Sequence, residues 1–249
     1  PANKDFNGAE QHGVGMHQVT HRNGERWSAT KAYLTPNLAR PNLTVITSAH
    51  TTRILTEGKR AVGVEYRQGS ELKQLKASKE VLLCAGALQS PQILLWSGIG
   101  AAAQLQQHGI AVVHDLPGVG ENLHDHIDVV QVVNAPHLKD LFGVSLSGVW
   151  QAIKGIFEWR KYRRGMLTTN FAEAGGFIKT SPDEATPDLQ FHFVIGKLVD
   201  HGRKPTFGHG YSCHVCLMRP KSRGRVTLAS ANPMAAPLID PNFLADSDD

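Results

Sequence analysis

The sequence predicts an α+β fold, in which an α/β part over residues 1–128 precedes a mostly antiparallel part over residues 129–249. Two observations carry this prediction. Between residues 80 and 114, short apolar runs alternate with helical patterns, which is typical of an α/β layer. Beyond residue 165, strand-like runs follow one another without a helical pattern between them, and strands that lack helical crossovers pair antiparallel. The character of the sequence changes near Asp128.

Strand patterns dominate after a Gly- and His-rich stretch, residues 1–30, that we expect to be mostly loop. Ser28 is expected to cap a short helix over residues 31–34. Apolar and β-branched residues predict strands at 43–47, 51–56, 61–67 and 71–76, of which the second and third form a hairpin turning at residues 57–59. The apolar run 80–84 predicts a short strand buried on both faces.

A helix is expected over residues 91–97. Ser90 can accept a hydrogen bond from an early helix N–H, and Pro91 would occupy the first helical position, where no donor is needed. Gly98 suits a left-handed helix stop. A second helix is predicted over residues 101–108 and a short strand over 110–114.

In the second part, an amphipathic pattern predicts a helix over residues 146–164. Its apolar stripe comprises Val149, Ile153, Ile156 and Phe157. Basic residues fill the last turn, where cations complement the helix dipole. A core-packed helix with a solvated basic end is favoured over a membrane-surface helix. Strands are predicted at 129–134, 173–179, 189–195, 211–218 and 225–229.

Composition limits the class of protein. The 249 residues are 41% hydrophobic and 19% charged, with a net charge of +4 and no apolar run near the roughly 20 residues of a membrane helix. Three cysteines make no disulfide framework, so we expect a reducing, cytoplasmic location. The sequence leaves open whether the protein also associates peripherally with a membrane through the basic helix end at residues 160–164. No basic stripe interleaved with aromatic residues indicates nucleic-acid binding. Since the chain begins with Pro1, we expect it to be a piece of a longer protein.

Two turns compete for a nucleotide. The string Gly98-Ile99-Gly100-Ala101-Ala102-Ala103 matches a dinucleotide-binding fingerprint, but that motif requires a strand before its first glycine, and here a helix is predicted. The turn at residues 84–87 instead follows a predicted strand, at the edge where ligands of α/β sheets bind. Its small residues Ala85 and Gly86 would let a ligand approach the backbone, although a plain tight turn explains them equally well.

Three polar clusters have ordinary explanations beside functional ones. The run 124–128, with two histidines and two aspartates, is compatible with a metal but is better explained by structural hydrogen bonds. Cys213 and Cys216 resemble a metal or redox pair, yet in a strand they point to opposite faces, which favours packed cysteines. Glu173 lies among small and apolar residues, so it either pairs with an arginine, which is the default, or holds a cationic ligand.

Residues 86–100, GALQSPQILLWSGIG, resemble a long signature of the glucose–methanol–choline (GMC) oxidoreductases. The resemblance continues through residues 42–47, 60–67, 118–126 and 219–243 and covers nearly the whole chain. It is strongest to choline dehydrogenase-like members. The resemblance implies FAD as cofactor, oxidation of an alcohol to an aldehyde by hydride transfer to the flavin, an FAD domain assembled from separate stretches, and a substrate domain built on an antiparallel sheet.

The same resemblance implies roles for four residues. Ala85 and Gly86 match a strand-end contact with FAD, and Thr51 matches a position whose backbone meets the adenine. Glu173 matches a position that faces the trimethylammonium group in choline-oxidising members, although relatives acting on other alcohols share the acid. These assignments place 1–128 in a partial FAD-binding domain and 129–249 in a substrate-binding domain.

The chain also departs from the family pattern. The FAD fingerprint and the catalytic histidine of the family lie outside this sequence, so no catalytic residue is assigned and the isolated chain is expected to be inactive. The resemblance leaves open whether the electron acceptor is a quinone or oxygen. A non-catalytic binding module that uses the antiparallel part alone is the alternative function, and the predicted strand, turn and helix at 80–98 count against it.

Overall fold

A computed structural model describes residues 1–204 and 206–249. It divides into two compact units, each formed from two separate stretches of the chain. Unit 1 contains Pro1–Leu43 and His126–Arg219, and unit 2 contains Thr44–Asp125 and Pro220–Asp249. Both units mix helices with antiparallel sheets, as the predicted fold class requires. The roles assigned to residues 1–128 and 129–249 stay predictions.

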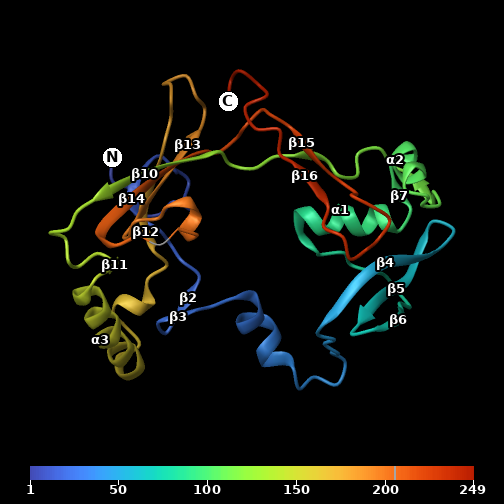
Figure 1. Ribbon diagram of the computed structural model, residues 1–249, viewed down its shortest axis with the longest axis horizontal. Coiled ribbons are helices and arrows are strands. Elements are labelled where there is room, and N and C mark those ends of the chain that lie inside the picture. The colour runs from blue at the N-terminus through green and yellow to red at the C-terminus, as the bar shows by residue number, and fades with distance from the viewer. Residues whose placement is uncertain (205) are drawn as a thin grey trace. The chain divides into compact units, whose positions relative to one another are not determined.

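Unit 1 is built on an antiparallel sheet with the strand order β1-β12-β13-β14-β10, and β11 pairs with β14 (Figure 1). The bounds are β1 Gly13–Met16, β10 Asp128–Asn134, β11 Gly143–Val144, β12 Ala172–Ile178, β13 Leu189–Val194 and β14 Gly208–Leu217. The four strands predicted between residues 129 and 218 are thereby confirmed. β1 was not expected, because its four residues carry too little alternation to distinguish them from the surrounding loop.

Alternation along the strands buries one face of this sheet. Phe177, Val194, Ser212 and Cys216 are buried there. Phe6, in the N-terminal loop, packs on Phe177, with ring centroids 5.0 Å apart. Burial of this apolar surface is the main source of stability in the unit.

Helix α3, Leu146–Tyr162, begins where predicted, because the Ser145 hydroxyl accepts a hydrogen bond from the Gly148 N–H at 3.0 Å. It ends at Arg163, which takes a left-handed conformation. The prediction that its apolar stripe packs into the core is wrong. Val149, Phe157 and the other stripe residues are exposed, and the buried helical residue is Gly155. Small residues allow closer packing than bulky ones, and α3 turns its small residues inward.

Unit 2 contains a meander in the order β4-β5-β6, a second sheet in the order β16-β15-β9, and the helices α1 and α2. The bounds are β4 Ala49–Glu57, β5 Arg60–Gln68, β6 Glu71–Lys76, α1 Gly86–Trp96, β7 Ile99–Gly100, α2 Ala102–Gln107, β8 His114–Asp115, β9 Glu121–Leu123, β15 Gly224–Thr227 and β16 Leu238–Asp240. The predicted hairpin, third strand and second helix are confirmed. Leu95, Leu105 and Leu228 form the buried core of this unit.

Three predictions in unit 2 are wrong. Residues 43–47 and 80–84 form no strand, and the second segment leaves Leu82 exposed rather than buried. A strand needs a backbone partner, and neither segment has a ladder partner in the described part of the chain. Between residues 110 and 115, only the two residues of β8 are strand.

The first helix begins five residues earlier than expected, at Gly86 rather than Pro91. Gly86 adopts a φ of +83°, and the Ser90 hydroxyl accepts a bond from the Ala85 N–H at 3.1 Å. These features start the helix ahead of the proline, which then lies inside it and removes one helical hydrogen bond. Gly98, with a φ of +78°, is the left-handed stop that was predicted.

The remaining elements are short. Strands β2, His21–Arg22, and β3, Glu25–Arg26, form a small hairpin in unit 1. The single helical turns are η1 Thr30–Leu34, η2 Thr35–Asn37, η3 Met166–Thr168 and η4 Asp200–Gly202. Among the described residues, no helix is both long and apolar enough to cross a membrane.

Candidate functional site

A cavity of about 160 Å³ lies in unit 2 between strand β4 and helix α1. Two residues that sequence resemblance marked as nucleotide contacts, Thr51 and Ala85, both line it. Its other lining residues are Ala49, His50, Gln89, Gln92, Ile93 and Trp96. Thr51 belongs to β4 and Ala85 is the N-cap residue of α1, so the fold brings these two distant positions to one wall.

Two polar lining residues hold the cavity wall in place. Gln92 is buried and donates from Nε2 to the Ala235 carbonyl at 2.9 Å, and His50 Nε2 donates to the Pro233 carbonyl at 2.9 Å. They tie the segment after β15 to β4 and α1. Sequence reasoning missed both residues. The amide of Gln92 on an otherwise apolar face of the helix was the signal that could have identified one of them.

Ser97 joins β4 to α1 directly. Its buried hydroxyl accepts a bond from the Ile54 N–H at 2.8 Å and donates to the Ile93 carbonyl at 2.6 Å. One hydroxyl therefore satisfies a backbone donor on the edge strand and an acceptor in the last turn of the helix. This link sets the separation of the two elements that flank the cavity.

The start of α1 leaves backbone groups available to a ligand. Ala85 caps the helix without a side-chain hydrogen bond to its first turn. A Cβ at Gly86 would meet no atom within 4 Å, so the glycine is required for its positive φ rather than for space. The first N–H groups of a helix carry partial positive charge, which favours an anion or a ribose hydroxyl there.

The fingerprint at residues 98–103 does not form a nucleotide site. A Cβ at Gly98 would lie 2.3 Å from the Ala111 carbonyl oxygen, and one at Gly100 would lie 2.4 Å from Leu95 Cδ2. Protein atoms therefore occupy the space that a pyrophosphate would need. The Asp115 carboxylate accepts the Ala102 N–H at 2.9 Å and so occupies the start of α2. As predicted, these glycines serve packing at a helix–helix corner.

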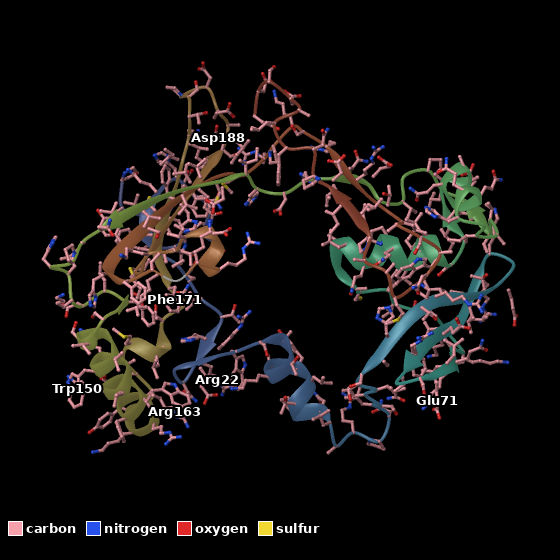
Figure 2. The ribbon with its side chains drawn as sticks, viewed as in Figure 1. Arg22, Glu71, Trp150, Arg163, Phe171 and Asp188 are labelled. Atoms are coloured by element: carbon pink, nitrogen blue, oxygen red, sulfur yellow. The ribbon has the colours of Figure 1, made fainter. Side chains whose placement is uncertain are left out.

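Glu173 lies in unit 1 at a β-bulge of β12, between Ala172 and Ala174. Its side chain is half-buried and has no ion pair within the described residues, so the expected pairing with an arginine is absent there. Phe171, two residues earlier and labelled in Figure 2, takes a left-handed φ of +67°. Its ring packs edge-on against that of Phe142. Left-handed phenylalanine is strained, and such strain is concentrated near functional sites.

A second cavity, of about 170 Å³, lies beside this bulge within unit 1. Phe142, Phe171 and Val194 form part of its apolar lining, and Lys197 and Lys204 also line it. The two ammonium groups would repel a cationic ligand in this cavity. Glu173 itself does not line it.

The Asp128 carboxylate forms a structural cluster on the buried face of the unit 1 sheet. It accepts His214 Nδ1–H at 2.7 Å, and the Cys216 thiol lies 3.5 Å from its other oxygen. Burial and the nearby Asp128 charge raise the pKa of Cys216 to about 11, so this thiol is unreactive. Cys213 lies three residues away on the same strand, on the other face. In the described part of the chain, no three such side chains are placed to hold a metal ion.

Comparison with known proteins identifies the family. Residues 1–128, more than half of the chain, match the family model described as GMC oxidoreductase. The chain belongs to the GMC oxidoreductase family. The resemblance drawn from the sequence is therefore confirmed.

Two curated GMC relatives illustrate the similarity. An alcohol dehydrogenase (acceptor) from Pseudomonas putida is 51% identical over 99% of this chain and 45% of its own length. The mitochondrial choline dehydrogenase of Homo sapiens is 42% identical over 100% of this chain and 42% of its own length. The chain spans about half the length of the curated relatives it matches.

Solved structures of other oxidoreductases share the fold. A formate oxidase superposes with a TM-score of 0.86 at 24% identity, over 100% of this chain and 48% of that one. An FAD-dependent oxidoreductase from Chaetomium thermophilum gives a TM-score of 0.80 at 25% identity, over 99% of this chain and 49% of that one. The GMC family and these neighbours are flavoproteins.

The residues of the unit 2 cavity fit part of an FAD molecule. Adenine is flat and largely apolar on its faces, and Ile93, Trp96 and Ala85 offer an apolar wall. The open backbone at Gly86 and the uncapped start of α1 suit the polar groups that follow the base. The chemistry of the described residues therefore fits an adenosine group.

Proposed function

We propose that this chain is the middle portion of an FAD-dependent dehydrogenase that oxidises a primary alcohol to its aldehyde, and that its unit 2 cavity receives the adenosine part of FAD. One observation carries the proposal: Thr51 and Ala85, which the family resemblance implies as FAD contacts, line one cavity. When bound, FAD would accept the hydride that leaves the alcohol carbon. The contribution of the described residues is to bind and orient the cofactor.

Each residue has a distinct part in this proposal. The backbone at Thr51 meets the adenine edge, while Ala85 and Gly86 leave room at the start of α1 for the sugar or phosphate. Ile93 and Trp96 exclude water from one face of the base. His50 and Gln92 hold the opposite segment through the bonds described above.

The substrate is proposed to be a choline-like primary alcohol, with Glu173 binding its cationic group. This proposal is supported by the relatives named choline dehydrogenase and by the half-buried carboxylate of Glu173, which has no ion pair among the described residues. A carboxylate with no arginine partner stabilises a quaternary ammonium group by charge. The electron acceptor is proposed to be a quinone or oxygen, and the location cytoplasmic with peripheral membrane association.

The test of the FAD site is a change of cavity volume in the full-length gene product. Ala85→Leu adds a bulky side chain where the sugar or phosphate would lie, and we expect FAD to bind at least roughly tenfold more weakly, because overpacking typically costs 1–3 kcal/mol. Thr51→Ala should retain FAD, since only its backbone is used. The measurement is FAD per protein by absorbance, followed by titration of the apoprotein.

Ala103→Leu is the matched control, because Ala103 is exposed on α2 and lies outside the cavity lining. FAD retention in Ala85→Leu equal to that of the control would remove the adenosine site from the proposal. A normally folded Ala85→Leu protein, judged by its circular dichroism, is required for the comparison.

A further inference from the structure

Helix α3 turns its large apolar side chains outward. Leu146 is 94% exposed, Trp150 67% and Phe157 69%. At about 100° per residue, the six exposed apolar residues lie within roughly 80° of one direction, opposite to Gly155. They are Leu146, Val149, Trp150, Ile153, Ile156 and Phe157. We call this set the α3 stripe, and Figure 2 shows Trp150 on the outer side of the helix, away from η3.

The other side of α3 is already packed. Gly155 is buried against Met166 and Leu167 of η3. The Trp159 Nε1–H donates a hydrogen bond to the Gly24 carbonyl at 2.7 Å. Arg163 pairs with Glu25 at 2.8 Å, which fixes the end of the helix to the β2–β3 hairpin. The orientation of α3 is therefore set by specific contacts, and the α3 stripe is presented as a rigid surface.

The charges on this surface are of one sign. Lys154, Arg160 and Lys161 are exposed, lie along or beside the α3 stripe, and have no ion-pair partner among the described residues. The single acidic residue of the helix, Glu158, lies on the packed side and pairs with Arg164. A surface that is apolar over three turns and basic in the last turn matches a partner that is apolar inside and anionic at its boundary.

We propose that the α3 stripe docks on the surface of a lipid bilayer that carries anionic headgroups. Trp150 and Phe157 would enter the boundary between headgroups and acyl chains, and Arg160 and Lys161 would contact the headgroup phosphates. Aromatic residues favour this boundary, and Lys and Arg reach phosphates from it. The proposal specifies the surface that makes the peripheral membrane association of the proposed function, and it rests on that association.

A second copy of the chain is a poorer occupant. Two α3 stripes packed antiparallel would place Arg160 and Lys161 of one copy against Leu146 and Val149 of the other. Four cations would then be desolvated without an acidic partner, which is costly. An anionic bilayer removes this conflict, because the charges remain at its hydrated surface.

The test is flotation of the full-length gene product with lipid vesicles. We expect it to float with vesicles of phosphatidylcholine and phosphatidylglycerol, less with phosphatidylcholine alone, and less in high salt. Arg160→Gln with Lys161→Gln should weaken binding to anionic vesicles by roughly twenty- to thirtyfold, because each basic residue near such a surface contributes about a factor of five. Trp150→Gln with Phe157→Gln should weaken binding to both kinds of vesicle.

Matched controls keep the test specific. Leu72→Gln on β6 removes an exposed apolar side chain, and Lys59→Gln removes an exposed charge; both should float as the wild type does. Activity with a soluble dye acceptor should be unchanged in every variant, because no residue of α3 belongs to the proposed cofactor or substrate site. Flotation is measured independently of enzyme activity. Failure of the enzyme assay alone would therefore count against the proposed function but not against membrane docking.

Four outcomes would overturn the proposal. The first is a wild type that does not float with anionic vesicles, and the second is α3 variants that float as well as the controls. A wild type that dimerises by sedimentation, and becomes monomeric in Trp150→Gln with Phe157→Gln without floating in either form, would assign the stripe to a second copy. A large loss of thermal stability in that variant without vesicle binding would assign it to another part of the full-length protein.

Discussion

Gly98 and Gly109 both hold a left-handed backbone, yet only Gly98 is surrounded by protein atoms. A Cβ at Gly98 would lie 2.3 Å from the Ala111 carbonyl oxygen, whereas one at Gly109 would meet nothing within 4 Å. Gly98→Ala is therefore expected to lower the free energy of unfolding by about 2–5 kcal/mol, the sum of backbone strain and overpacking.

Gly109→Ala, the matched control, should cost only about 1–2 kcal/mol from backbone strain. Chemical denaturation of both variants measures the difference. Equal losses in the free energy of unfolding would mean that glycine is needed at position 98 only for its positive φ and not for lack of space. If Gly98→Ala lost FAD without losing stability, residues 98–103 would again be a candidate nucleotide site.

His17 and His192 make unit 1 sensitive to acid. Their rings lie 5.3 Å apart on the buried side of the sheet, and burial lowers the pKa of both below the ordinary value. The Phe191 carbonyl acts to raise the pKa of His17. The pKa of His192 is lowered further by the nearby histidines 17, 214 and 126 and is raised by Asp128.

The sign of the pH effect follows from proton binding. Below the ordinary histidine pKa near 6.5, the unfolded chain binds protons that the folded chain does not, so stability falls as the pH falls. The expected slope is at most about 1.4 kcal/mol per pH unit for each histidine.

His192→Gln should flatten the decline in stability below pH 6.5, and His137→Gln, at an exposed position, should not. Denaturant midpoints measured across the pH range give the comparison. Parallel curves for wild type and His192→Gln would contradict the assignment.

At the scale of elements, the contact between β4 and α1 depends on Ser97. Its buried hydroxyl satisfies the Ile54 N–H and the Ile93 carbonyl together. Ser97→Ala leaves the donor of the edge strand without a partner, so we expect a loss of about 1–3 kcal/mol in stability and weaker FAD binding, because the cavity wall moves.

Ser78→Ala removes an exposed hydroxyl and is the control. Thermal melts and FAD titration of both full-length variants measure the effects. A Ser97→Ala protein as stable as the control would show that water replaces the hydroxyl.

Elements were predictable from the sequence where their stabilising contacts are local or between consecutive strands. The hairpin of β4 and β5 satisfies its own backbone groups, so alternation and a glycine turn were sufficient to predict it. Residues 80–84 have the composition of a buried strand, but composition does not supply a pairing partner. The orientation of α3 was missed because periodicity identifies an apolar side without saying what covers it. Gly155 rather than Phe157 faces inward.

At the scale of the whole molecule, the residues predicted to bind FAD and the residue predicted to bind the substrate lie in different units. Thr51, Ala85 and Gly86 belong to unit 2, and Glu173 belongs to unit 1. Glu173→Gln in the full-length product is expected to raise KM for choline about tenfold or more, while KM for a neutral primary alcohol and FAD content stay near wild type. The reason is that only choline carries the charge that the carboxylate stabilises.

Ala85→Leu should show the reverse pattern, with FAD lost and the preference for choline unchanged in the remaining holoenzyme. Steady-state kinetics with both alcohols, together with FAD content, separate the two effects. Equal changes in KM for both alcohols in Glu173→Gln would remove the cation-binding role.

The candidate site was predictable only in part. Ala85 and Thr51 were found because a family signature marked them, whereas His50 and Gln92 bond to a segment more than 140 residues away in sequence. No local pattern reports such a contact. The false fingerprint at residues 98–103 was rejected from sequence because a helix precedes it, and its crowded glycines give the physical reason.

The discontinuous make-up of unit 2 has a consequence for synthesis on the ribosome. Strand β9 is synthesised about 100 residues before β15, the strand it pairs with. His50 is synthesised 183 residues before Pro233, whose carbonyl it hydrogen-bonds. At roughly 5–20 residues per second, the first delay is on the order of 5–20 s. During that interval unit 1 is being translated, while the first stretch of unit 2 carries unpaired strand edges that chaperones recognise. The cavity that we propose for the nucleotide would therefore be completed late, and we expect cofactor loading to follow translation of the Pro220–Asp249 stretch.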